Sequence, residues 1–293
     1  MSGAVVKWGF RLGFVPAILL GGNAIAIAIV ESGANHVWLA ALILGAIVLS
    51  FTAEGVVPYN SDWNLSQNDR IRDTIHFIVN ESANFATIFA LPFLAGAIPN
   101  LDVWPQGWPV WAQLLLAIGI VDCGITLAHL ASHRINWLWR FHAVHHSVKR
   151  MYGFNGLMKH PIHQMIEGIC GFAPLLLIGM PQQIAWLLIV AIALQLLLQH
   201  SNADIRVGPF KYILALAPAH RFHHLNSARD GDVNFGLFTM IWDWMLGTAS
   251  FDPKRKFESK DLGIEDNENY PTAYLSQLTE PFRANQSSGE QRE

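Results

Sequence analysis

The stretch PVWAQLLLAIGIVDCGITLAHLASHR, residues 109–134, joins a long apolar run to a pair of histidines. Residues 109–127 contain one charged side chain, Asp122, and a helix needs roughly 17–25 mainly apolar residues to cross a bilayer. His129 and His133 follow four residues apart, so both lie on one face if the helix continues. The stretch predicts a membrane helix that ends in two side chains able to bind a metal.

Five further stretches are also predicted to cross or enter the membrane: residues 12–30, 37–53, 75–98, 165–180 and 183–199. The first could be read as a secretory signal, but its apolar run is longer than a signal core, and we expect it to be retained. The last two flank Met180-Pro181 and are expected to form a hairpin. The fold class is therefore an all-α polytopic membrane protein with about six membrane segments.

The amino-acid composition agrees with a surface that faces lipid. Hydrophobic residues make up 52% of the 293 residues and charged residues only 14%, against about 25% in soluble domains. The net charge of -3 offers no basic field for nucleic acid, so we expect no nucleic-acid partner. The two cysteines lie in apolar stretches and indicate neither a structural disulfide nor a thiolate metal site.

The distribution of basic residues predicts the topology. All nineteen Lys and Arg residues fall in the N-terminal segment, the loop 54–74, the segment 128–164 or residues 200–293. The turns 31–36, 99–108 and 181–182 contain none. Because cytoplasmic loops are enriched in Lys and Arg, we expect a multi-pass protein with both termini in the cytoplasm.

Histidines are concentrated and patterned in the second half of the chain. Eleven of the thirteen lie between His129 and His224, and the pattern His-x-x-His-His occurs twice. Residues three and four apart share a helix face, so each cluster can direct several imidazoles to one point. Surface histidines that tolerate the headgroup region are the alternative, but the repetition favours metal ligands. Eight or nine imidazoles exceed the four ligands of one zinc ion, so two metal ions are the simpler reading.

Imidazole suits iron, zinc, copper or nickel alike, so the residues themselves do not choose the metal. The chain has no His-Glu-x-x-His, which excludes the usual zinc metalloprotease arrangement. It also has no Glu-x-x-His of the kind found in carboxylate di-iron bundles. Metals held by neutral nitrogens retain a high positive charge, which favours oxidation of an unactivated C–H bond at the membrane surface.

Two stretches resemble the histidine motifs of the fatty acid hydroxylase and sterol desaturase superfamily. They are HLASH at 129–133 with LWRFHAVHHS at 138–147, and PAHRFHH at 218–224 with the downstream NFG and WDWMLGT pieces at 234–236 and 242–248. Asp122 also matches a position of the family. The resemblance extends from about residue 122 to residue 282.

This resemblance implies a helical membrane domain with a cytosolic histidine-rich helical cap and a centre of two iron ions. It divides the chain into a transmembrane region (1–110), a catalytic domain (111–250) and a polar C-terminal tail (251–293). The metal ligands carried over by position are His129, His133, His142, His145, His146, His200, His220, His223 and His224. His160 is a less secure candidate, because Pro161 after it disfavours a helical backbone and the ring could instead order the pocket.

Two acidic residues in apolar segments need an explanation. Asp122 lies seven residues before His129 on the same helical face, and we expect it to accept a hydrogen bond from a ligand imidazole. The other reading is a helix-end carboxylate in water. Glu81, together with Asn80 and Asn84, is costly inside lipid and marks either a polar cavity or a position at headgroup depth.

The main hypothesis is oxygen-dependent hydroxylation or desaturation of a membrane lipid, such as a sterol or fatty acyl chain, at two iron ions on the cytoplasmic face. Dioxygen is the co-substrate. No Rossmann or nucleotide-binding pattern is present, so a separate redox protein must deliver the electrons. The alternatives are a zinc-dependent membrane hydrolase, and a metal transporter or haem-binding protein without catalysis.

Overall fold

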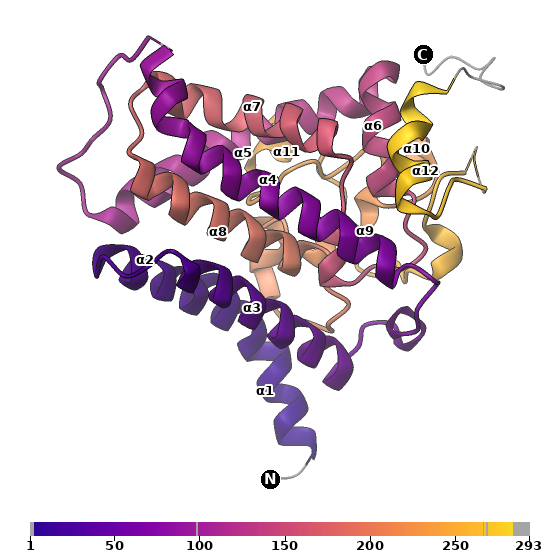
Figure 1. Ribbon diagram of the computed structural model, residues 1–293. Coiled ribbons are helices and arrows are strands. Elements are labelled where there is room, and N and C mark those ends of the chain that lie inside the picture. The colour runs from indigo at the N-terminus through magenta and orange to yellow at the C-terminus, as the bar shows by residue number, and fades with distance from the viewer. Residues whose placement is uncertain (1–2, 98, 266, 268, 284–293) are drawn as a thin grey trace.

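The computed structural model describes residues 3–97, 99–265, 267 and 269–283, and this part of the chain is helical. It contains no strand, only isolated bridges between single residues. Figure 1 shows long helices stacked on one side and short helices and loops gathered on the other. The predicted all-α class is confirmed.

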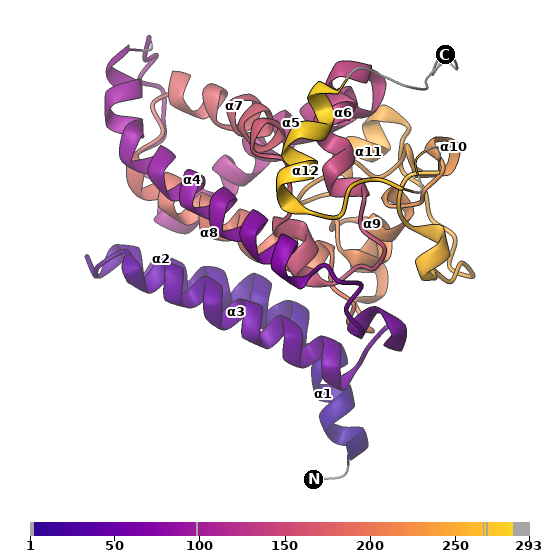
Figure 2. The same ribbon diagram turned by 45° about the vertical axis from the view of Figure 1, so that its right-hand side comes forward.

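The N-terminal apolar run forms one helical rod with an irregular centre. Helix α1 (Gly3–Pro16) passes through a π-helical stretch (Ala17–Gly22) into α2 (Asn23–Glu31), and α3 (Val37–Val56) returns beside α2. Proline and π-helical turns are common causes of helix bending. Figures 1 and 2 show the rod changing direction between α1 and α2.

Four more long helices complete the bundle: α4 (Arg70–Ala97), α5 (Val110–Arg134), α7 (Pro161–Leu177) and α8 (Gln182–Gln199). Within the described residues, four helical segments are long and apolar enough to span a membrane: Gly3–Glu31, Val37–Val56, Val110–Arg134 and Gln182–Gln199. The structure thus supports a membrane protein, while the count of six segments stays a prediction. A short turn joins α7 to α8, and the membrane hairpin stays a prediction because α7 is not among these four segments.

Helix α8 forms the centre of the bundle. Its side chains are buried on nearly every side from Ile184 to Gln199, and α2, α3, α4 and α5 pack around it. A helix that is apolar around its whole circumference is stable only inside a protein or a membrane. The main hydrophobic core therefore draws on both the predicted transmembrane region and the predicted catalytic domain.

Helices α5 and α7 pack closely because each has a glycine at the contact. A Cβ atom on Gly124 would collide with the backbone of Cys170, and one on Gly171 would lie 2.6 Å from Val121 Cγ2. Small residues allow the backbones of membrane helices to approach each other in this way. The contact fixes α7 against the helix that carries His129 and His133.

The short elements form a cap at one end of the bundle (Figure 2). Its helices are α6 (Asn136–His146), α9 (Ala217–His223), α10 (Ala228–Gly231), α11 (Ile241–Leu246) and α12 (Tyr274–Thr279). Short 3-10 turns lie at Ser61–Asn64, Gly153–Leu157, Gly208–Tyr212, Ser259–Asp261 and Glu280–Phe282.

The predicted polar tail is packed on this cap where it is described. Phe257 and Leu262 are buried in a small apolar cluster with Trp63. Gln277 is fully buried, and its side chain lies 3.0 Å from His76 Nε2 and donates to Ser147 Oγ. Residues 284–293 of the tail lie outside the described part of the chain.

Candidate metal centre

The structure brings all nine predicted ligands together in two adjacent groups. The five-histidine group contains His129, His133, His142, His146 and His223. The four-histidine group contains His145, His200, His220 and His224. Within each group, one ring nitrogen per residue lies within 4.8 Å of the others, and all nine side chains are buried.

Helix geometry explains how each group assembles. His129 and His133 occupy one face of the last turns of α5, and His142 and His146 are likewise four apart on α6. His220 and His223 lie on α9 with His224 at its end, and His200 ends α8. The centre therefore lies where two long bundle helices meet two short cap helices.

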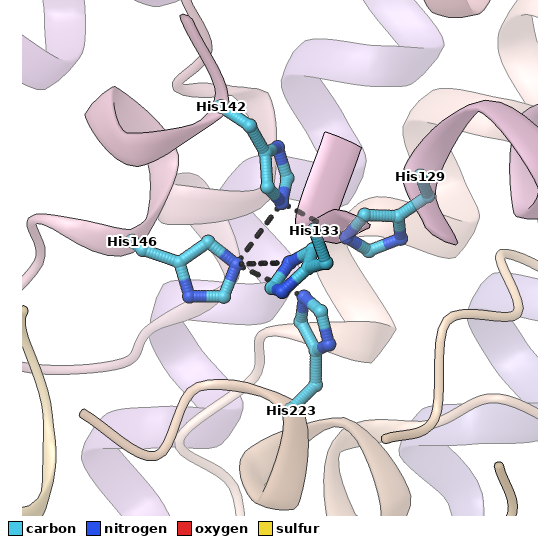
Figure 3. Close-up of side chains that lie close together, drawn as sticks. All are labelled: His129, His133, His142, His146 and His223. Atoms are coloured by element: carbon cyan, nitrogen blue, oxygen red, sulfur yellow. Dashed lines mark hydrogen bonds between the residues drawn. The ribbon is translucent and has the colours of Figure 1, made fainter. Parts of the chain in front are cut away.

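The imidazole nitrogens converge on two points. In the five-histidine group, His146 Nε2 lies 3.0 Å from the Nε2 atoms of His142 and His223 and 3.2 Å from that of His133 (Figure 3). In the four-histidine group, His200 Nε2 lies 3.1–3.2 Å from the three other Nε2 atoms. Two nitrogens bound at right angles to one metal at about 2.1 Å lie about 3.0 Å apart, so this spacing suits metal ligation.

The tautomers of His145 and His200 give a second test of whether these residues fit a metal ion. His145 Nδ1 lies 2.9 Å from Met158 O and His200 Nδ1 lies 3.1 Å from Leu196 O. A carbonyl oxygen only accepts, so Nδ1 carries the hydrogen in both rings and each Nε2 presents a lone pair. The two Nε2 atoms nevertheless face each other at 3.1 Å, a contact that requires a cation between or beside them. The residues present therefore fit a bound metal ion.

Backbone carbonyls orient the five-histidine group in the same manner. His129 Nδ1 donates to Phe235 O and His223 Nδ1 donates to Val233 O, both at 2.9 Å. His133 is different, because its Nδ1 lies 2.8 Å from the carboxylate of Asp232. Such hydrogen bonds fix the tautomer and the ring plane of a metal ligand, and a carboxylate partner raises its basicity.

Burial keeps the cap histidines neutral and ready to bind. Loss of hydration, followed by the repulsion of neighbouring imidazoles, lowers the pKa of His142, His146, His220 and His224 well below the usual range. Burial also lowers the pKa of His200 to about 3. Neutral imidazole is the form that binds a metal, so protonation does not compete with ligation near pH 7.

The expected role of Asp122 is wrong. Its carboxylate does not contact a ligand imidazole and instead accepts hydrogen bonds from Leu237 N, Phe238 N and Thr239, at 2.7–3.1 Å. The helical spacing correctly placed Asp122 below His129, but the space between them is filled by the loop 235–239. Asp122 therefore acts on His129 through this loop, whose Phe235 carbonyl orients the ring.

Asp243 is a functional residue that the sequence reasoning missed. Its carboxylate accepts hydrogen bonds from Phe235 N, Gly236 N and Thr248 Oγ1, at 2.7–2.8 Å, and it is fully buried. It holds the first two amides of the loop 235–239, and Asp122 holds the amides of the next three residues. The available signal was a charged residue inside the apolar run IWDWML, followed by Thr248 five residues later.

The two remaining histidines of this region lie outside both groups. His160 caps α7: its Nδ1 accepts from Ile162 N at 3.1 Å and its Nε2 donates to Leu278 O at 3.2 Å. His163 contacts Ser132 Oγ through Nε2 at 3.0 Å, and its ring lies 4.4 Å from that of His142. The structure thus favours an ordering role for His160 over a place among the ligands.

A cleft leads from the bundle to the histidines. A small cavity is lined by residues of both groups, namely His129, His142, His145, His200 and His220. A second cleft lies between α4, α5, α7 and α8 and is mostly apolar, with Phe172, Ile189 and Ile192 in its wall. The two share Ile125, Lys159, Glu167, Leu196 and Leu237, so the second cleft adjoins the histidine groups.

The chain is similar to several enzymes that oxidise lipids. It is 31% identical to an ornithine lipid hydroxylase of Rhizobium tropici over 276 residues, which cover 91% of this chain and 82% of that protein. It is 32% identical to an alkylglycerol monooxygenase of Danio rerio over 148 residues, half of this chain and 31% of that protein. A Delta(7)-sterol-C5(6)-desaturase of Nicotiana tabacum is 30% identical over 151 residues, covering 50% of this chain and 52% of the relative.

The profile of the family called fatty acid hydroxylase matches residues 114–248, which contain all nine histidines. No solved structure matches the chain. The relatives include a hydroxylase, a monooxygenase and a desaturase, all of them oxidoreductases. This protein therefore belongs to the fatty acid hydroxylase and sterol desaturase superfamily, as a membrane enzyme that oxidises lipids.

Proposed function

We propose that this protein hydroxylates a membrane lipid at a pair of iron ions on the cytoplasmic face, with dioxygen as co-substrate. The observation that carries the proposal is the convergence of nine buried imidazoles on two adjacent points beside an apolar cleft. Hydroxylation is preferred to desaturation because the relative that covers 91% of this chain is a hydroxylase. An ornithine lipid, the substrate named for that relative, is the first substrate to test.

The five-histidine group and the four-histidine group would each hold one ion. Iron bound there would activate dioxygen with two electrons from a separate donor, so that one oxygen atom enters the C–H bond of the lipid and the other leaves as water. The chain contributes the rest. Phe235 O, Met158 O and Asp232 hold the rings in the tautomer that leaves Nε2 free, and burial excludes water from the site.

The shape of the cleft supports a lipid as substrate. Ile125, Phe172, Ile189 and Ile192 give it an apolar wall, and it is framed by helices of the membrane bundle. A lipid could enter sideways from the bilayer with its chain along this wall. Its reacting carbon would then meet the histidine groups at Ile125 and Leu196, which belong to both cavities.

The cytoplasmic placement rests on charge. The turns that contain no Lys or Arg connect α2 to α3, α4 to α5 and α7 to α8, and they gather at the end of the bundle away from the cap (Figure 2). Basic residues are enriched on the cytoplasmic side of membrane proteins, which supports a cytoplasmic cap and cytoplasmic termini. A separate redox protein would then supply electrons to the cap from the cytosol.

The proposal is tested with purified protein in nanodiscs, loaded with iron and supplied with dioxygen, an electron donor and an ornithine lipid. The product is followed by mass spectrometry as a lipid that has gained one oxygen atom. The double variant His145→Ala/His223→Ala, with one ligand lost from each group, should show no product above background. His36→Ala, which changes an exposed histidine at the other end of the bundle, is the matched control and should keep full activity.

Two results would overturn the proposal. One is lipid oxidation that survives in the double variant. The other is an active wild-type enzyme that contains only zinc and consumes no dioxygen, which would point to hydrolysis.

A further inference from the structure

Three polar side chains lie together in the wall of the mostly apolar cleft next to the histidines. Glu81 and Asn84 project from α4 and Gln164 projects from α7, and all three belong to the cleft wall. Glu81 is only 8% exposed. Of the two readings of its sequence context, the structure supports a polar cavity. We call these three residues the Glu81 site.

A chain of hydrogen bonds in this site leads from Gln164 through Asn84 to the carboxylate of Glu81. Gln164 Nε2 donates to Asn84 Oδ1 at 2.8 Å, and this orients the amide so that Asn84 Nδ2 faces Glu81. Asn84 Nδ2 lies 3.4 Å from both carboxylate oxygens of Glu81, a long contact to each. A carboxylate has about four acceptor positions, and among the described residues Asn84 Nδ2 is the one side-chain donor that reaches Glu81.

The cleft wall contains two carboxylates, Glu81 and Glu167, but one ammonium group, that of Lys159. Lys159 Nζ and Glu167 form a buried ion pair at 2.5 Å, where the cleft meets the histidine cavity. That pair engages the one ammonium group in the cleft wall, so Lys159 forms its close ion pair with Glu167 and acts on the second carboxylate, Glu81, only at longer range. Across residues 3–97, 99–265, 267 and 269–283, no basic nitrogen lies within 4.0 Å of the Glu81 carboxylate. A buried carboxylate without a close cation is costly, and a cationic ligand in contact with Glu81 would offset that cost.

We propose that the Glu81 site binds a primary ammonium group of the lipid substrate. This rests on the proposed function, and it selects amino lipids among the membrane lipids that the apolar cleft could hold. The ammonium group donates hydrogen bonds to the open oxygens of Glu81, while Asn84 and Gln164 keep the carboxylate in place. Lipids whose polar group is only a hydroxyl lack the charge that the cleft needs.

The test measures binding, separately from oxidation. Iron-loaded protein is kept without dioxygen in nanodiscs of phosphatidylglycerol, which has no ammonium group. An ornithine lipid with a free side-chain ammonium is titrated against its N-acetylated counterpart, and the bound fraction is measured by native mass spectrometry. The proteins compared are wild type, Glu81→Gln, Glu81→Asp and the exposed-carboxylate control Glu31→Gln.

Wild type should bind the free ammonium lipid at least about tenfold more tightly than the acetylated lipid, because a desolvated charge pair is lost in the second case. Glu81→Gln should lose this preference, Glu81→Asp should keep part of it, and Glu31→Gln should behave as wild type. The iron content of each variant confirms that it folds. Equal binding of the two lipids by wild type, or an unchanged preference in Glu81→Gln, would overturn the proposal.

The experiment distinguishes failure of the binding proposal from failure of the proposed function. If wild type prefers the ammonium lipid through Glu81 but forms no oxygenated product when dioxygen is admitted, the binding proposal stands and the proposed function fails. If product forms while Glu81→Gln keeps its preference for the ammonium lipid, the proposed function stands and the role of Glu81 is refuted.

Discussion

The two histidine groups are built from the same residue type but differ in number and in support. The five-histidine group has an extra ligand and includes His133, whose partner is the carboxylate of Asp232. In the four-histidine group, carbonyls orient His145 and His200, whereas Nδ1 of His220 and of His224 is buried without a hydrogen-bond partner in the described part of the chain. On a six-coordinate ion, five nitrogens leave one open position and four leave two. We therefore expect two metal sites that are not equivalent, with the four-histidine group the one that loses its ion more easily.

The largest effect on metal content and activity should come from removing a ligand of the four-histidine group, compared with removing one of the five-histidine group. His200→Ala reduces the four-histidine group to three ligands, and the protein should retain about half of its metal and lose activity by more than about 100-fold. His133→Ala leaves four ligands in the other group, so both ions should remain, with weaker binding. Metal content by elemental analysis and product formation check this. Equal metal loss in the two variants would contradict the comparison.

A fall in pH should destabilise the metal-depleted protein. Burial lowers the pKa of His145, His200, His220 and His224 in the folded state, whereas the unfolded chain regains a pKa near 6.5. Below that pH the unfolded state binds more protons, so the free energy of unfolding decreases by up to about 1.4 kcal/mol per pH unit for each histidine. Thermal unfolding between pH 8 and pH 5 measures this, and a flat profile would contradict it.

Asp122→Asn should weaken the loop 235–239, whose Phe235 carbonyl orients His129 of the five-histidine group. The substitution replaces one acceptor oxygen with an amide that faces the donors of Leu237, Phe238 or Thr239, at a cost of about 2–3 kcal/mol. A lower melting temperature and partial metal loss are expected, because Phe235 O then holds His129 less firmly. Asp102→Asn, at an exposed loop position, is the control and should change neither quantity.

Asp232→Asn should affect the affinity of one site without unfolding the protein. Asparagine keeps the shape but removes the negative charge beside His133 Nδ1. Loss of such a partner typically weakens metal binding by about tenfold or more. Competition with a chelator should give a weaker first site and an unchanged second one. If the affinity of both sites falls equally, the two groups are coupled, and the expectation that they bind metal independently is wrong.

The smallest effect is expected for His160→Ala. The imidazole accepts from Ile162 N at the start of α7, and loss of a helix cap costs about 1 kcal/mol. The melting temperature should fall by a few degrees while both metals remain bound. Metal loss comparable to that of His200→Ala would return His160 to the list of ligands.

Much of the site could be predicted from local spacing. His129 and His133, and the two His-x-x-His-His patterns, share helix faces whatever the remainder of the fold does. The apolar runs predicted the long helices, and α5 and α8 deliver His133 and His200 to the same end of the bundle. These features depend on residues close together in the chain, and helix geometry alone fixes the relative directions of their side chains.

The partners of Asp122 and of Asp243 could not be predicted in this way. Both carboxylates hold the loop 235–239, and Asp122 reaches it across more than 110 positions of sequence. The loop lies between Asp122 and His129 because α8 and the cap pack there, which no local pattern encodes. His160 was ambiguous for a related reason, since its Nε2 partner, Leu278 O, lies in the distant tail.

The sequence by itself determined that this protein is helical, faces lipid and carries clustered histidines able to bind metal, because composition and helical period are local properties. The family resemblance supplied the set of nine. Only the tertiary structure decided that these histidines divide into groups of five and four. The division mixes residues from one motif, since His145 and His146 are adjacent in sequence yet belong to different groups. On a helix, neighbouring side chains point about 100° apart, so one motif contributes to both histidine groups, and chain packing decides which distant histidine completes each.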